Sequence, residues 1–211
     1  MASHPSAKPR RRYAPRMAPE QRREHLIDAA LEVILERGYA GVSIEAIARE
    51  AGITRPVVYD HFPNLGRLLH AVIEREERIS LEQLAKVVPE DPGELAPGEL
   101  LATGVARFLD AVTSRPATWR IILLPLEGTP SIVREHVELN RGLVLSRIES
   151  LVRWGIDRSR LPRDLDVELT ARTLRDWSEQ AARMVLTDPE RYPRERYERF
   201  VKNFLELLTH S

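Results

Sequence analysis

Residues 54–61 bring together the side chains of this chain that are best suited to contact a nucleic acid. They predict a short helix that begins after Thr54 and whose first turn presents Arg55, Pro56, Val57 and Tyr59. The N-terminal end of such a helix meets base edges when a recognition helix enters the major groove. Pro56 falls at the second helical position, where it removes only one unpaired N–H, so we expect Thr54 to cap the N–H of Val57.

Catalytic or metal chemistry has little support in the sequence. The 211 residues include no cysteine, which excludes thiol catalysis, cysteine zinc sites and disulfides. The motifs G-x-S-x-G, G-x-G-x-x-G, H-E-x-x-H and the P-loop are absent. His136 beside Glu135 and Glu138 is the nearest approach to an acid–base or metal cluster, but these side chains diverge on a helix. We therefore expect no enzyme, cofactor or metal, and keep a small helical enzyme as the least favoured alternative.

The element before residues 54–61 completes a candidate helix-turn-helix. Ser43 can cap a helix over 44–51, and Gly52 supplies the left-handed residue that ends it. Ala48 and Ala51 allow the two helices to cross closely, while apolar residues at 53 and 58 fill the gap between them. A tight pair of helices also occurs in proteins that do not bind DNA, so the pattern alone leaves both functions open.

Apolar residues recur with helical spacing along nearly the whole chain, which predicts an all-α protein. We expect nine helices, at about 19–38, 44–51, 55–62, 65–87, 98–114, 117–124, 130–155, 165–187 and 193–209. Three parts follow: a basic arm at 1–18, a three-helix DNA-binding domain at 19–65 and a larger helical domain at 66–211. The fourth helix is long enough to serve both domains.

Charge is distributed unevenly although the net charge is zero. Residues 1–23 carry seven arginines or lysines and one glutamate, which favours contact with phosphate. A solubilising tail is the alternative for the first dozen residues. The apolar runs are too short to span a bilayer, and the basic N-terminus lacks the apolar region of a secretory signal. We expect a cytoplasmic protein without a membrane partner.

Residues 22–69 resemble the DNA-binding domain of the TetR family of transcriptional regulators. The resemblance rests on segments in the family's order: LIDAA at 26–30, GY at 38–39, VSI at 42–44, IAREAGI at 47–53 and VYDHF at 58–62. The expected helix count and the chain length also fit. The resemblance is specific in the N-terminal quarter and only architectural in the rest.

The resemblance implies roles at DNA for particular side chains. Arg55, Pro56 and Val57 match base-facing positions, and the guanidinium of Arg55 suits the O6 and N7 atoms of guanine. Three residues match contacts to the DNA backbone, namely Ser43, Tyr59 and His61. Thr54, directly before Arg55, is the last residue that we assign to the DNA-binding surface.

The start of the fourth helix departs from the family. Members often carry a phosphate-binding lysine there, and this chain has Leu65. Arg67 or the basic arm is our hypothesis for the missing contact. Leu65 and the zero net charge also motivate a second function, a helical adaptor that does not bind specific DNA.

The resemblance further implies that the larger domain binds a small molecule and dimerises through its last two helices. The proposed ligand contacts suit an apolar or aromatic effector and are Trp119, Ile122, Leu123, Leu126, His136, Leu139, Asn140, Leu143 and Trp177. The proposed dimer interface is Leu169, Thr173, Leu174, Trp177, Ala181, Met184, Val185, Tyr197, Phe200, Val201, Phe204 and Leu208. Ordinary core packing is the alternative for each residue of both sets.

Together these features predict a homodimeric, ligand-responsive regulator. We expect a repressor that binds a palindromic double-stranded DNA operator, because two recognition helices one DNA turn apart read such a site. An effector that favours a conformer with wrongly spaced helices would release it. Activation or corepressor-dependent repression remains an alternative within the same class.

Overall fold

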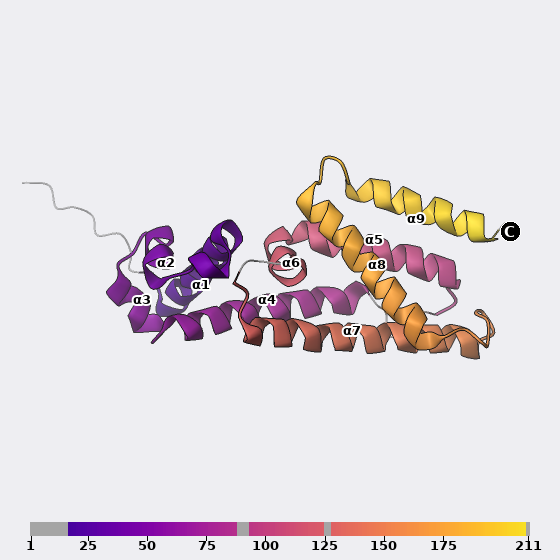
Figure 1. The fold of residues 1–211 in the computed structure, drawn as a ribbon, viewed down its shortest axis with the longest axis horizontal. Helices are drawn as coiled ribbons and strands as arrows, with labels where there is room; N and C mark the ends of the chain where they lie inside the picture. Colours follow the sequence, from indigo (N-terminus) through magenta and orange to yellow (C-terminus); the bar gives the residue numbers. More distant parts are fainter. Residues whose placement is uncertain (1–16, 88–92, 125–127, 210–211) are drawn as a thin grey trace, which may run out of the picture.

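The computed structural model describes residues 17–87, 93–124 and 128–209, with only the backbone given for Ile132 and for 207–209. Within these ranges the chain forms helices and no strand, which confirms the all-α prediction (Figure 1). The elements are α1 (Pro19–Arg37), the 3-10 turn η1 (Tyr39–Gly41), α2 (Ile44–Glu50), α3 (Arg55–His61), α4 (Leu65–Val87), α5 (Pro97–Ser114), α6 (Pro116–Leu123), α7 (Ser131–Asp157), α8 (Val167–Thr187) and α9 (Arg194–Thr209). No helix in the described ranges is long and apolar enough to cross a membrane.

Two apolar cores divide the molecule, and α4 contributes to both. The first core holds α1, α2 and α3 against the N-terminal half of α4, through residues such as Leu68 and Val72. The second core joins the end of α4, at Val87, to α5, α6, α8 and α9. Figure 1 shows α4 running from the small N-terminal unit into the larger one. A rigid helix shared in this way can transmit a shift of one unit to the other.

The larger unit also supports the smaller one directly. Ile121 of α6 and Val133 of α7 are buried in the first core. Gly128, with φ of +73°, lies so close to η1 that a Cβ atom there would be 2.8 Å from the amide nitrogen of Ala40. The N-terminal unit is therefore packed on the larger unit by more than its connection through α4.

A buried ionic cluster completes this contact between the units. Glu76 of α4 is 2% exposed and accepts hydrogen bonds from the Arg75 Nε, at 2.9 Å, and from the hydroxyl of Thr118 on α6. The same guanidinium reaches α1, where its Nη1 lies 2.6 Å from Asp28 and 3.3 Å from Glu24. Burial lowers the pKa of Arg75, but the hydrogen bonds and charges of Asp28 and Glu76 outweigh it and raise the pKa overall. The cluster thus ties α1, α4 and α6 together.

Candidate nucleic-acid interface and ligand cavity

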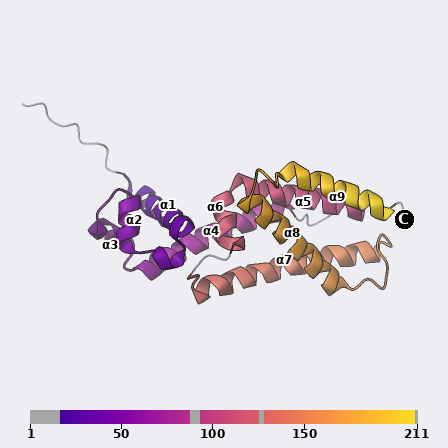
Figure 2. The ribbon, with the colours of Figure 1, turned by 45° about the horizontal axis from the view of Figure 1, so that its top comes forward.

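The first turn of α3 projects from the N-terminal unit. Val58 and Phe62 are buried in the first core, so the opposite face of α3 is exposed. That face carries Arg55, Pro56 and Tyr59, the last with 47% of its surface exposed. Figure 2 shows α3 beside α2, at the end of the molecule farthest from α9. A surface of this shape can enter a DNA groove.

Arg55 is held by a weak partner. Its Nη1 lies 3.0 Å from Glu45 Oε1 of α2, and both side chains are more than half exposed. An exposed ion pair of this kind contributes little to stability. Glu45 therefore orients the guanidinium in the free protein without preventing its transfer to a base.

Local hydrogen bonds fix the turn between α2 and α3. Ser43 Oγ accepts a bond from the Ala46 N–H at 3.1 Å, which confirms the expected cap. Gly52 has φ of +64°, the left-handed conformation for which glycine is suited, and the next N–H bonds to the Ala48 carbonyl at 2.9 Å. These bonds set the angle at which α3 is presented.

The expected cap by the Thr54 side chain is wrong. The Thr54 side chain makes no capping bond. Its main-chain carbonyl instead accepts the N–H of Val57 at 3.0 Å and of Val58 at 3.4 Å. This tight first turn satisfies the Val57 donor that the side chain was expected to bind, and Thr54 remains exposed beside Arg55.

The packing at the start of α4 accounts for an apolar residue, Leu65, at the position where a phosphate-binding lysine was expected. Leu65 packs against the first core. Asn64 provides the cap, since its Oδ1 accepts the Arg67 N–H at 2.9 Å. The Arg67 side chain is exposed, His61 is half-buried, and residues 1–16 of the basic arm lie outside the described residues. Arg67 stays our hypothesis for the phosphate contact.

A cavity of about 420 Å³ occupies the larger unit, between α4, α5, α6, α7 and α8. Four of the residues predicted to contact a ligand line it: Trp119, Ile122, Leu123 and Asn140. Most of its other walls are apolar, including Leu101, Val105, Phe108, Val144, Ile148 and Leu174. Such a lining suits the body of an apolar molecule.

The remaining predicted ligand contacts lie elsewhere. Leu139 and Leu143 are 68% and 57% exposed, because they project from α7 on the side away from the cavity. His136 is bonded to Glu77 beside the cavity, and Trp177 packs against the aromatic rings of α9. Leu126 lies outside the described residues.

Several polar residues on the cavity wall were missed by the sequence analysis. Glu179 of α8 is buried and is bonded by Arg141, at 3.1 and 3.2 Å, and by Arg183, at 2.6 Å. Glu77 of α4 bonds His136 Nδ1 through Oε2 at 3.0 Å. In the sequence Glu77 belongs to a charged run, while Glu179 and Arg141 are isolated charges without a motif. Only the packing of α4, α7 and α8 turns these side chains inward. Among the described residues, no group of three or more side chains is arranged to hold a metal ion.

The set predicted for a dimer interface divides into buried and exposed residues. Ala181, Val185 and Val201 are buried in the second core of the same chain, and Leu174 lines the cavity. Met184 and Tyr197 bond to each other and are partly buried. The residues that remain exposed or half-exposed are Leu169, Thr173, Trp177, Phe200 and Phe204. The side chain of Leu208 lies outside the described residues.

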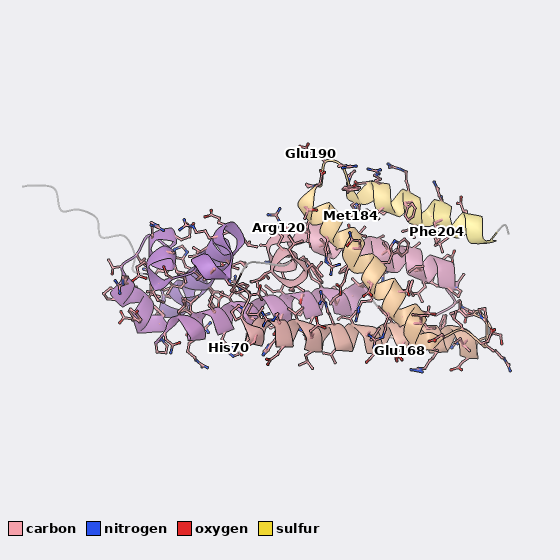
Figure 3. The ribbon with its side chains drawn as sticks, viewed as in Figure 1. His70, Arg120, Glu168, Met184, Glu190 and Phe204 are labelled. Atoms are coloured by element: carbon pink, nitrogen blue, oxygen red, sulfur yellow. The ribbon has the colours of Figure 1, made fainter. Side chains whose placement is uncertain are left out.

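The exposed aromatic residues form one cluster on α8 and α9. The ring centroids of Trp177 and Phe200 are 6.0 Å apart, and those of Trp177 and Phe204 are 6.2 Å apart. Phe200 and Phe204 are stacked, with 48% and 43% of their surfaces exposed. Figure 3 labels Phe204 on α9 and Met184 on α8. We call Trp177, Phe200 and Phe204 the aromatic patch.

Comparison with known proteins supports the same assignment for the N-terminal unit. Residues 26–72 match the family model "Bacterial regulatory proteins, tetR family". The HTH-type transcriptional regulator SrpR of Pseudomonas putida is 28% identical over 152 residues, covering 71% of this chain and 68% of SrpR. The N-terminal unit is therefore a TetR-type DNA-binding domain. These relatives are transcriptional regulators and not enzymes, which confirms the expectation that the chain has no enzymatic function.

Solved structures share the TetR-like fold over most of their length. MbdR from Azoarcus sp. CIB has a TM-score of 0.72 and 16% identity, over 87% of this chain and 96% of MbdR. A TetR-like regulator from Rhodococcus sp. RHA1 has a TM-score of 0.68 and 24% identity, over 90% and 99%. FadR from Bacillus subtilis, in complex with stearoyl-CoA, has a TM-score of 0.67 and 20% identity, over 86% and 96%. At these identities the likeness concerns the fold alone.

The His136–Glu77 pair of this TetR-like chain predicts a pH dependence of stability. The hydrogen bond and charge of Glu77 raise the pKa of His136 above its ordinary value near 6.5. A raised pKa in the folded state stabilises the protein fully below pH about 6.5, and this contribution is lost as the pH rises through the raised value. Urea unfolding should therefore show wild type more stable than His136→Gln at pH 6, with the difference shrinking towards pH 9. A difference that grows with pH would contradict the pairing.

Proposed function

We propose that this TetR-family regulator is a homodimeric repressor that binds a palindromic operator through α3 and is released by an apolar effector bound in the cavity. The observation that carries the proposal is the position of α4. Its N-terminal half packs on the helices that hold α3, and its later residues Glu77, Ser80 and Leu84 line the cavity. The operator DNA bound by α3 and the effector bound in the cavity therefore both act on α4.

Release follows from differential binding to two conformers. An effector that fits the cavity only when α4 is displaced would favour the conformer with that displacement. The cluster of Arg75 with Asp28 and Glu24 would carry the shift to α1. The two copies of α3 in the dimer would then no longer match successive major grooves. The stearoyl-CoA complex of the similar FadR supports a small-molecule effector for this fold.

The aromatic patch supports the dimer. Large aromatic side chains are enriched in protein interfaces, and three of them gathered on adjacent helices are unusual on a free surface. The patch lies on α8 and α9, the last two helices, where TetR-like proteins are expected to dimerise. We propose a second copy of this chain as its partner, related by a two-fold axis.

Fluorescence anisotropy on the DNA upstream of the protein's own gene tests the proposal. The upstream DNA should bind more tightly than a scrambled duplex of the same composition, and its affinity should fall steeply with salt as counterions are released. The same protein in analytical ultracentrifugation should be a dimer. A folded protein that binds neither duplex at low salt would contradict repression and favour the adaptor.

A further inference from the structure

One carboxylate oxygen of Glu77, a residue that lines the cavity, has no hydrogen-bond partner among the described residues. Glu77 Oε2 is bonded to His136, whereas Glu77 Oε1 is buried and accepts no hydrogen bond. Buried polar atoms are nearly always satisfied, by protein, ordered water or a ligand. Because Glu77 lines the cavity, a molecule bound there can supply the missing donor.

The surroundings of Glu77 favour a donor with positive charge. Glu74 and Glu135 act on the pKa of His136 from exposed positions, and Glu77 is the carboxylate at this end that lines the cavity. His70 and His136 face each other here, with ring centroids 6.2 Å apart (Figure 3 labels His70). A cation is attracted by the Glu77 carboxylate and a ligand carboxylate is repelled.

The other charged side chains of the cavity are already paired. Arg141 bonds both oxygens of Glu179 and also Glu138. Arg175 donates to Asp176 through Nε and Nη2, at 3.0 and 2.6 Å. These arginines therefore leave no free positive charge to bind an anionic head. The polar end of an effector has its best site at Glu77.

The shape of the cavity indicates an extended ligand. Its lining residues on α7 run from Val137 to Gly155, which at 1.5 Å per residue is about 27 Å along the helix. Between these ends the wall is formed by Val144, Ile148 and Leu151. At the far end the buried N–H of Trp154 also lacks a partner, and as a donor it does not attract a cation. The ligand's charged group is thus directed to Glu77.

We propose that the effector is an elongated apolar molecule with a cationic N–H donor at one end, such as a long-chain amine, and that Glu77 Oε1 accepts its hydrogen bond. This inference rests on the proposed function, in which the cavity is the effector site. It goes further because it fixes the charge of the ligand, its orientation and the residue that selects it.

Isothermal titration calorimetry of the full-length protein with decylamine, 1-decanol and decanoate at pH 7 compares three ligands that share an alkyl chain and differ in the head group. It therefore distinguishes the contribution of the head group to the affinity from that of the chain. We expect decylammonium to bind at least tenfold more tightly than the alcohol or the acid. Glu77→Gln should remove this preference and change the affinity for decanol less than twofold, which also shows that the cavity is intact. Glu82→Gln is the matched control, because Glu82 is an exposed carboxylate on α4 paired with Arg78.

The outcomes distinguish this inference from the proposed function. Decanoate or decanol binding as tightly as decylammonium, or a Glu77→Gln variant that keeps the preference, would overturn the role of Glu77 and leave the cavity as the effector site. If none of the three binds, the inference and the effector part of the proposed function both fail. Specific DNA binding in the anisotropy assay would stand in either case.

Discussion

Phe204→Asp should convert the dimer to a monomer and weaken operator binding at least a hundredfold. Phe204 is 43% exposed on α9 and belongs to the aromatic patch with Phe200 and Trp177. In the proposed dimer the new carboxylate would be buried against apolar rings without a cation to pair with, which strongly disfavours association. A monomer presents one copy of α3, so it loses the contacts of the second half-site.

Sedimentation equilibrium and anisotropy on the same samples measure both effects of Phe204→Asp. Lys202→Asp serves as the control, because residue 202 is exposed and lies on the opposite side of α9 by helical periodicity. This control should remain a dimer. A Phe204→Asp variant that still sediments as a dimer with unchanged operator affinity would show that another surface joins the two copies.

Glu76→Ala should lower the free energy of unfolding by about 3 kcal/mol, as expected when one partner of a buried ion pair is removed. Glu76 is 2% exposed and holds Arg75 and the buried hydroxyl of Thr118. Its loss leaves the Thr118 donor unsatisfied and opens a space between α4 and α6. Arg75 keeps Asp28 and Glu24, which limits the cost.

Urea denaturation of three variants checks this assignment. Glu76→Gln retains an acceptor for Thr118 and should cost less than Glu76→Ala. Glu82→Ala removes an exposed carboxylate from the same helix and should stay within about 0.5 kcal/mol of wild type. Equal stability of Glu76→Ala and Glu82→Ala would mean that the buried cluster does not join the two units.

The elements of the N-terminal unit could be predicted because their determinants are local. The Ser43 cap and the left-handed Gly52 act within one turn of the chain, and the structure has both as expected. The expected cap by the Thr54 side chain is absent because the Thr54 main-chain carbonyl accepts the N–H of Val57 instead. The bounds of the longer helices agree within two residues, because proline lies next to most of the predicted ends, although α7 continues through Gly155 to Asp157.

The residues around the cavity and on α8 and α9 could be predicted only in part. An apolar stripe shows that a helix face is covered, but not whether the cover is its own chain or a second copy. Val185 and Val201 are covered by their own chain, whereas Phe200 and Phe204 are not. Glu77 lies in a run of charges, and its inward direction depends on how α7 packs on α4.

Arg55→Ala, measured on the upstream DNA and on a scrambled duplex, tests most directly whether α3 reads sequence. Loss of one base-contacting arginine costs about 1–3 kcal/mol on the correct site, which is roughly a tenfold to hundredfold weaker affinity. We expect this loss on the upstream DNA, little change on the scrambled duplex and an unchanged melting temperature, because the Arg55–Glu45 pair is exposed. Arg78→Ala, on the exposed face of α4, should match wild type on both duplexes. An Arg55→Ala variant with wild-type preference for the upstream DNA would show that α3 does not read the operator through Arg55.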